Sequence, residues 1–192
     1  MSGSRLNKLK NILRQMPSAL VAFSGGTDSA FLLAVARPLL KRNILAATAV
    51  NASFPRSELL QAAALAKKLG VRHRIIADSP PKEFWENSPK RCYFCKKALF
   101  AKLKRIAAQR RLKYVIDATN ADDAGDFRPG TKALRQLGVR SPLAEAGLSK
   151  QEIRRFSRAM GLQTWRKPAM PCLATRVAYG EKITLRKLAT LA

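Results

Sequence analysis

Residues 24–29, SGGTDS, combine two glycines, three hydroxyls and one carboxylate between an apolar run and a helical pattern. Glycine lets backbone N–H groups approach phosphate oxygens closely, and the start of a helix adds unpaired donors and the positive end of a dipole. The order strand, Gly-Gly turn, helix therefore predicts a phosphate cradle. Asp28 is too acidic to face phosphate unaided, so we expect it to cap the helix or to hold Mg²⁺. The six residues are Ser24, Gly25, Gly26, Thr27, Asp28 and Ser29.

Three cysteines form the other set of residues with obvious chemistry. Cys92 and Cys95 make a CxxC pair, and Cys172 stands alone much further along the chain. Three thiols in a chain that we expect to be cytoplasmic do not make a disulfide framework. Their spacing is compatible with four interpretations, and it favours a metal or a cluster only slightly.

The first interpretation is a [4Fe–4S] cluster held by the three cysteines, which leaves one iron open for an exogenous ligand. The second is a Cys3His zinc site, with His73 as the fourth ligand because it is the only histidine. The third is a redox-active CxxC pair, and the fourth is an inert pair beside a reactive Cys172. The basic neighbours Arg91, Lys96 and Lys97 are expected to favour thiolates.

The elements that must position these residues alternate between strands and helices. Strands are predicted at 19–23, 44–50, 73–77 and 114–118, with a short fifth strand at 139–141. Helices are predicted at 28–40, 56–69, 94–109, 131–137 and 149–160, and Ser149 with Glu152 forms a capping box at the start of the last one. This alternation predicts an α/β, Rossmann-like parallel sheet of about five strands with helices on both faces. Ligands of such sheets bind beyond the C-terminal strand ends, where the glycine motif lies.

The composition indicates one basic domain. The chain has 192 residues, with 37 Lys and Arg against 12 Asp and Glu, giving a net charge of +25. A field of that size attracts polyanions, so nucleic acid or a phosphorylated substrate with ATP is a candidate partner; a generally basic, solvated surface explains the charge equally well. The sequence contains no apolar run long enough for a membrane span and no signal-peptide core, and we expect a cytoplasmic protein without membrane contact.

Longer motifs indicate a family. SGGTDS resembles the PP-loop of ATP pyrophosphatases, and RCYFCKKALF, ATNADDAGDFRPG, VRSPLAEAGLSKQEIRRFSRAMGL and TWRKPAMPCLATRVAYGE together resemble the LarE family, from about Leu20 to the last residue. The resemblance implies an adenine nucleotide alpha hydrolase-like fold and an ATP-dependent sulfur transferase. Such an enzyme adenylates a carboxylate of pyridinium-3,5-biscarboxylic acid mononucleotide and releases pyrophosphate. Sulfur then displaces AMP, on the way to the nickel-pincer cofactor of lactate racemase.

The resemblance also implies two alternative sulfur sources. In one type of member, the cysteine at the position of Cys172 gives up its own sulfur and becomes dehydroalanine. In the other type, the CxxC pair and that cysteine hold a [4Fe–4S] cluster whose open iron carries a sulfide. Because Cys92, Cys95 and Cys172 are all present, we expect the three-cysteine cluster type. Cys172 is required in both.

The same resemblance assigns roles to further residues. The SGGTDS residues should bind the pyrophosphate of ATP, with Asp28 as a catalytic residue beside Cys172. The end of the second strand, Ala49 to Asn51, should lie beside adenine through main-chain groups. A polar loop is expected to serve Mg²⁺ or the ribose through one of Asn120, Asp122, Asp123 and Asp126, unless it is simply a turn with local hydrogen bonds. Two arginines, Arg128 and Arg176, are expected to bind substrate or AMP phosphate.

Members of the family normally continue past the Tyr-Gly-Glu segment into a second domain. We therefore expect a PP-loop domain at 1–178 and the start of a truncated C-terminal region at 179–192. A homo-oligomer is expected if the second domain is present. Two other functions compete: a PP-loop tRNA thiolase with an Fe–S cluster, and a catalytically incomplete ATP-binding remnant. tRNA is the weaker partner candidate, because no zinc-ribbon pair or separate RNA-binding module is visible.

Overall fold

Four parallel strands form one sheet in the part of the chain that the computed structural model describes, residues 2–124 and 129–191. Their order across the sheet is β3-β2-β1-β4. Ala19 pairs with both Ile44 and Tyr114, and Leu45 pairs with Arg72. The strands are β1 (Ala19–Ala22), β2 (Ile44–Val50), β3 (Arg72–Ala77) and β4 (Tyr114–Ile116). The predicted α/β fold with a parallel sheet is confirmed, and three of the four strand starts fall where the sequence placed them.

The predicted fifth strand at 139–141 is wrong. This segment makes only a single parallel bridge, between Ile116 and Arg140. Pro142 follows directly and begins the short helix α7 (Pro142–Glu145). Because proline has no N–H and suits the first turn of a helix, the chain leaves the sheet before a ladder can form.

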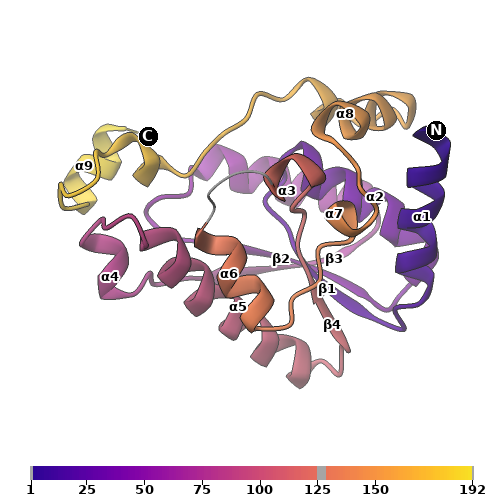
Figure 1. Cartoon of the computed structure of the whole chain (residues 1–192), viewed down its shortest axis with the longest axis horizontal. Helices are drawn as coiled ribbons and strands as arrows, with labels where there is room; N and C mark the ends of the chain where they lie inside the picture. The colour runs from indigo at the N-terminus through magenta and orange to yellow at the C-terminus, as the bar shows by residue number, and fades with distance from the viewer. Residues whose placement is uncertain (1, 125–128, 192) are drawn as a thin grey trace.

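Each face of the sheet has its own apolar core. Val21 of β1 points into the core on one side, while its neighbour Leu20 points into the core on the other. This alternation of two buried faces is typical of a parallel sheet between helical layers. The first core includes α1 (Ser2–Arg14), α2 (Thr27–Leu40), α3 (Arg56–Lys68) and α8 (Lys150–Ala159). The second lies under α5 (Arg91–Gln109) and α6 (Pro129–Gln136), which run together along the lower part of the view in Figure 1.

The C-terminal part of the chain returns across the molecule. After α8 it runs along the top of the view in Figure 1 to the left-hand end of the molecule, where α9 lies next to α4. A third, small core joins Phe84 of α4 to Leu173, Ile183 and Leu188. Buried Asn87 supports this contact by donating from Nδ2 to the carbonyls of Ala178 (2.6 Å) and Glu181 (2.8 Å). The elements involved are α4 (Lys82–Trp85), η3 (Leu173–Arg176) and α9 (Leu185–Thr190), whereas η2 (Gln163–Arg166) packs against α8.

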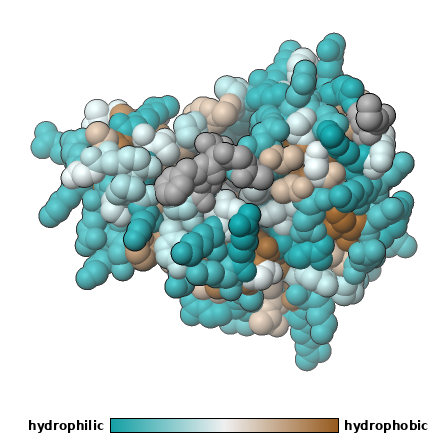
Figure 2. All heavy atoms as spheres, in the orientation of Figure 1, coloured by the Kyte–Doolittle hydropathy of each residue, from teal (hydrophilic) through white to brown (hydrophobic). Residues whose placement is uncertain are grey.

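Hydrophilic side chains cover most of the face shown in Figure 2, with small apolar patches between them. Within residues 2–124 and 129–191, every helix is too short or too polar to cross a membrane.

Candidate functional site

A cavity of about 690 Å³ opens at the C-terminal edge of the sheet. The segments that follow β1, β2, β3 and β4 all contribute to its wall, as expected for a ligand site of a parallel sheet. Further parts of the wall come from α5, from Thr131 of α6, from Lys150 of α8 and from the segment that follows α8. The volume lies within the range of small-molecule and cofactor sites. Its wall includes the residue groups 22–29, 47–55, 95–103, 117–123 and 167–172, not every member of each, with Asp78 and Lys150.

The glycine motif forms a tight turn at the mouth of this cavity. Gly25 has φ +75°, and a Cβ added there would lie 2.8 Å from Cβ of Ala62. Gly26 is the N-cap residue of α2. The hydroxyls of Ser24 and Ser29 lie 3.1 Å apart within hydrogen-bond distance, and the N–H of Gly26 donates to Ser24 Oγ at 3.3 Å. The turn is therefore held in one conformation at the start of a buried helix, the arrangement that binds phosphate.

Gly25→Ala is expected to destabilise the protein more than Gly138→Ala. Both glycines have positive φ, but a Cβ at Gly138 meets nothing within 4 Å. Left-handed backbone costs about 1–2 kcal/mol for alanine, and the overlap with Ala62 adds about 1–3 kcal/mol. Denaturant unfolding measures the difference. Gly26→Ala is the local control, because its φ is −75° and its Cβ would lie 3.4 Å from Ser24 Oγ. Equal losses for Gly25→Ala and Gly138→Ala would contradict the close packing of the turn.

Asp28 lies in the first turn of α2 with its two carboxylate oxygens in different surroundings. Oδ2 accepts a hydrogen bond from Nζ of Lys150 at 2.6 Å. Oδ1 is buried and has no hydrogen-bond partner among the described residues. A buried carboxylate oxygen without a donor, next to a cavity, fits a cation ligand, and Mg²⁺ prefers such oxygens. The helix cap that the sequence allowed for Asp28 is not made, since Gly26 is the N-cap.

Two lysines bring positive charge to the turn. Lys150 pairs with Asp28, and Lys167 forms an ion pair with Glu58 (2.7 Å) and donates to Gln61 Oε1 (2.8 Å). Lys167 Nζ also lies 3.5 Å from the carbonyl oxygen of Gly25. Both ammonium groups border the cavity, so they can offset phosphate charge. Neither lysine could be predicted from the sequence, because both follow the glycine motif by more than a hundred residues and carry no local signal.

The loop after β2 connects the end of that strand to the thiol of Cys172. Asn51 Nδ2 donates to Asp78 Oδ2 at 3.1 Å, and Asn51 Oδ1 accepts from both the N–H and the hydroxyl of Ser53. The thiol of Cys172 in turn donates to Ser53 Oγ at 3.2 Å. Ala49 lies in the same wall. One hydrogen-bonded chain thus runs from the strand end predicted for adenine to the cysteine predicted to react.

The three cysteines come from two segments. Helix α5 begins at Arg91 rather than at the predicted position 94, so Cys92 lies in its first turn and Cys95 at the start of the second. Cys95 and Cys172 both line the cavity, and Cys172 is exposed. Among the described residues, no three His, Cys, Asp or Glu side chains are gathered closely enough to hold a metal.

His73 does not support the zinc interpretation. Its Nε2 lies 2.8 Å from Thr48 Oγ1, and its ring packs edge-on against Phe23. Burial lowers the pKa of His73, which favours a neutral imidazole. The only histidine of the chain therefore contributes to packing beside the sheet rather than to the thiol site.

Cys95 departs from the expectation that basic neighbours favour thiolates. Burial raises its pKa to about 12, and the negative charges of Asp78, Cys172 and Cys92 act in the same direction. Lys96 lowers the pKa but is outweighed. Position at a helix start could not reveal this, because burial depends on the tertiary packing.

Iodoacetamide at about pH 8 is therefore expected to modify exposed Cys172 and to leave Cys95 unmodified. The Cys95 thiolate forms only as the pH rises through about 12, so its labelling should stay low below that range. Peptide mass spectrometry after timed alkylation measures both sites. The control is the same reaction in denaturant, where Cys95 should react at about pH 8. Equal labelling rates in the folded protein would contradict the burial of Cys95.

The polar loop after β4 is partly a turn. Asn120 is buried, and its Oδ1 accepts from the N–H of Asp122, while Asp123 Oδ2 accepts from the N–H of Asn120. Asp123 borders the cavity, and Asn120 is not among the lining residues. The predicted residues Asp126 and Arg128 lie outside the described residues.

The structure does not bring Arg176 to the cavity. Arg176 is exposed, and its guanidinium donates to the carbonyl of Leu191 at 2.8 Å, near the C-terminal end of the chain. Asp117 and Thr119, which the sequence analysis did not select, do line the cavity. Asp117 fell inside the strand predicted at 114–118, whereas β4 ends at Ile116, so both residues lie beyond the C-terminal end of that strand.

Comparisons with known proteins give one family and several relatives. The family model described as asparagine synthase matches residues 9–112. An uncharacterized protein of Synechocystis sp. is 42% identical over 96% of this chain and 70% of its own length. The pyridinium-3,5-bisthiocarboxylic acid mononucleotide synthase of Lactiplantibacillus plantarum is 34% identical over 90% of this chain and 63% of its own length. The fold is similar to the NH3-dependent NAD synthetase from Campylobacter jejuni, with a TM-score of 0.62, 18% identity, and coverage of 92% of this chain and 81% of that one.

Proposed function

We propose that this chain is an ATP-dependent sulfur transferase. The chain belongs to the asparagine synthase family of ATP-using PP-loop proteins. The acceptor that we propose is a carboxylate of pyridinium-3,5-biscarboxylic acid mononucleotide, and the product is the thiocarboxylate. The name of the Lactiplantibacillus plantarum relative supports this acceptor. The chain spans 63% of the length of that relative, so its substrate and pathway come to this chain as a proposal.

One observation carries the proposal. A single cavity contains the glycine turn, which suits the phosphates of ATP, and the thiol of Cys172, which suits sulfur transfer. A carboxylate is a poor electrophile, and it must be activated before sulfur can replace oxygen. A site that holds ATP beside a thiol can perform both steps on one bound acceptor without releasing the reactive intermediate.

In the first step a carboxylate oxygen of the acceptor attacks the α-phosphate of ATP. A bond forms between that oxygen and phosphorus, and the bond between the α-phosphorus and the bridging oxygen breaks, so pyrophosphate leaves. The backbone N–H groups of the glycine turn and the hydroxyls of Ser24 and Ser29 bind the leaving pyrophosphate. Lys150 and Lys167 offset its developing charge. Asp28 Oδ1 would hold Mg²⁺, which supplies further charge neutralisation when bound.

In the second step sulfur attacks the acyl carbon, and AMP leaves with the electron pair of the carbon–oxygen bond. We propose that the sulfur arrives at Cys172. If Cys172 itself is the source, its thiolate forms a thioester with the acceptor. Loss of the α-proton then breaks the bond between Cβ and sulfur, giving the thiocarboxylate and a dehydroalanine at this position.

The other proposed source is a [4Fe–4S] cluster on Cys92, Cys95 and Cys172, which when bound supplies an iron open to an exogenous sulfide. Three cysteine sulfurs are suitable ligands for such a group. Beyond the effect of burial, the negative charges of Cys172 and Cys92 raise the pKa of Cys95, which indicates that the three side chains interact electrostatically. Among the described residues these thiols are not gathered closely enough to hold a metal, so such a cluster would need them closer together than they lie in this structure. Cys95 must also lose its proton, because thiolates are the ligands.

Anaerobic reconstitution with iron and sulfide separates the two sources. Broad visible absorption with about four irons per chain is expected for the cluster. A colourless protein, whose Cys172 loses one sulfur and two hydrogens after turnover, would assign the sacrificial source instead.

The proposed function itself is tested by exchange of radiolabelled pyrophosphate into ATP. Exchange should require the pyridinium biscarboxylate mononucleotide and Mg²⁺, because the first step is reversible while the acyl-adenylate stays bound. A matched control uses the same nucleotide with both carboxylates reduced to alcohols. Exchange that is independent of the acceptor, or absent with it, would contradict the proposal.

A further inference from the structure

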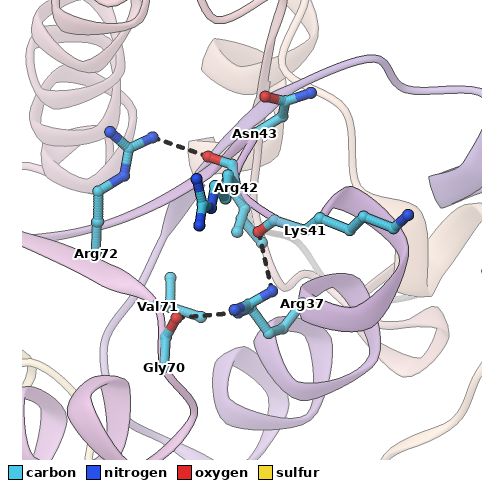
Figure 3. A pocket seen from close by; sticks show the side chains of 8 residues that line it. Arg37, Lys41, Arg42, Asn43, Gly70, Val71 and Arg72 are labelled. Atoms are coloured by element: carbon cyan, nitrogen blue, oxygen red, sulfur yellow. Dashed lines mark hydrogen bonds between the residues drawn. The ribbon is translucent and has the colours of Figure 1, made fainter.

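A second cavity, of about 480 Å³, lies at the N-terminal ends of β2 and β3, opposite to the end of the sheet where the first cavity opens. Figure 3 shows the residues that line it. Its wall is formed by the end of α2, the turn that follows, and the start of β3. Four of the lining side chains are cationic, and none of the lining residues is acidic. The lining residues are Arg37, Lys41, Arg42, Asn43, Ile44, Gly70, Val71 and Arg72.

Main-chain carbonyls hold two of the arginines in place. Arg37 donates from Nε to the carbonyl of Gly70 at 2.9 Å and from Nη1 to the carbonyl of Lys41 at 3.1 Å. Arg72 donates from Nη2 to the carbonyl of Arg42 at 2.8 Å. In the view of Figure 3 the guanidinium of Arg42 lies between those of Arg37 and Arg72. Three like charges around one cavity repel one another, and a bound anion would offset that repulsion.

A neighbouring cavity, of about 460 Å³, shares Arg72 with the first one. Arg74 and Arg110 add two more cations to its wall. His73 also lines it, and its lowered pKa means that it adds no charge at neutral pH. The two cavities therefore present a row of cations around the start of the edge strand β3.

We propose that this basic edge binds the phosphodiester backbone of a nucleic acid. Two adjoining cationic cavities can bind successive phosphates of one strand, whereas a single small anion would fill only one of them. Arginine predominates, and its planar guanidinium binds phosphate through paired hydrogen bonds. The net charge of +25 adds long-range attraction for a polyanion. Because this edge lies opposite the ATP cavity, the nucleic acid anchors the enzyme and is not the acceptor of sulfur.

The test measures binding of fluorescent RNA and DNA oligonucleotides of one sequence by anisotropy over a range of salt concentrations. The variant Lys41→Gln/Arg42→Gln/Arg74→Gln/Arg110→Gln removes four charges from the two cavities. Among the described residues these four side chains make no hydrogen bond or ion pair, so the fold should be retained, which a thermal melt checks. We expect affinity to fall about tenfold or more, with a shallower dependence on salt. Comparing the affinities for RNA and DNA shows whether the 2′-hydroxyl contributes to binding.

A matched control removes four charges elsewhere, in Lys8→Gln/Arg155→Gln/Lys182→Gln/Arg186→Gln. These side chains lie outside both cavities. We expect less than about a threefold change for this variant, given the screening of distant charges. Equal losses in the two variants would mean that only the overall charge acts, and no binding by the parent protein would equally overturn the proposal. Pyrophosphate exchange should be unchanged in both variants, so a failure here is distinguishable from a failure of the proposed function.

Discussion

Asp28→Asn will lower the rate of acceptor-dependent pyrophosphate exchange by about 10²–10³-fold, the size of effect seen when one electrostatic stabiliser of a transition state is removed. Oδ1 of Asp28 is buried without a hydrogen-bond partner in the described structure, at the wall of the cavity. An asparagine keeps the shape but loses the negative charge that Mg²⁺ requires. Initial exchange rates at saturating ATP and Mg²⁺ measure the loss.

The effect on folding should be small by comparison. The ion pair between Asp28 and Lys150 is partly exposed, with side-chain exposures of 22% and 34%, so its loss costs about 1 kcal/mol or less. Thermal melts of the variant separate stability from activity. Glu86→Gln is the matched control, since Glu86 is exposed and does not line the cavity. Exchange by Asp28→Asn at more than about a third of the parent rate would contradict the assigned role.

Cys172→Ala will abolish sulfur transfer to the acceptor while leaving pyrophosphate exchange within about threefold of the parent rate. The thiol of Cys172 is the exposed one in the cavity, and its only described hydrogen bond is to Ser53. Adenylation requires the glycine turn and the acceptor, neither of which involves this sulfur. Mass spectrometry of the acceptor after a single incubation reports the thiocarboxylate.

Cys95→Ala is the informative companion to this variant. If the three cysteines hold a cluster, Cys95→Ala should also stop transfer. If Cys172 is the source of its own sulfur, Cys95→Ala should still deliver one sulfur per chain. Thiocarboxylate formed by Cys172→Ala at the parent level would remove Cys172 from the mechanism under both alternatives.

Local signals in the sequence predicted the sheet and the glycine turn well. The apolar run before residue 24 became β1, and the capping box of Ser149 and Glu152 forms as expected at the start of α8. Gly25 adopts the positive φ that a glycine turn permits. These features depend on residues that are close together in the chain, and periodicity and turn chemistry can reveal them.

Features that depend on distant contacts were missed or misjudged. Lys167 reaches the glycine turn from the other end of the chain, and nothing near it in the sequence indicates that partner. The rise in the pKa of Cys95 depends on burial, which outweighs the adjacent Lys96. Arg176 was selected for a phosphate but is bound to a C-terminal carbonyl. Tertiary packing decides each of these cases.

The most direct test of the account follows ATP labelled at the α-phosphate during incubation with the pyridinium biscarboxylate mononucleotide and Mg²⁺. Cleavage between the α- and β-phosphates predicts labelled AMP and an equal amount of pyrophosphate, both dependent on the acceptor. Labelled ADP with inorganic phosphate, or ATP that remains intact in the presence of the acceptor, would contradict the central claim that this chain activates a carboxylate by adenylation.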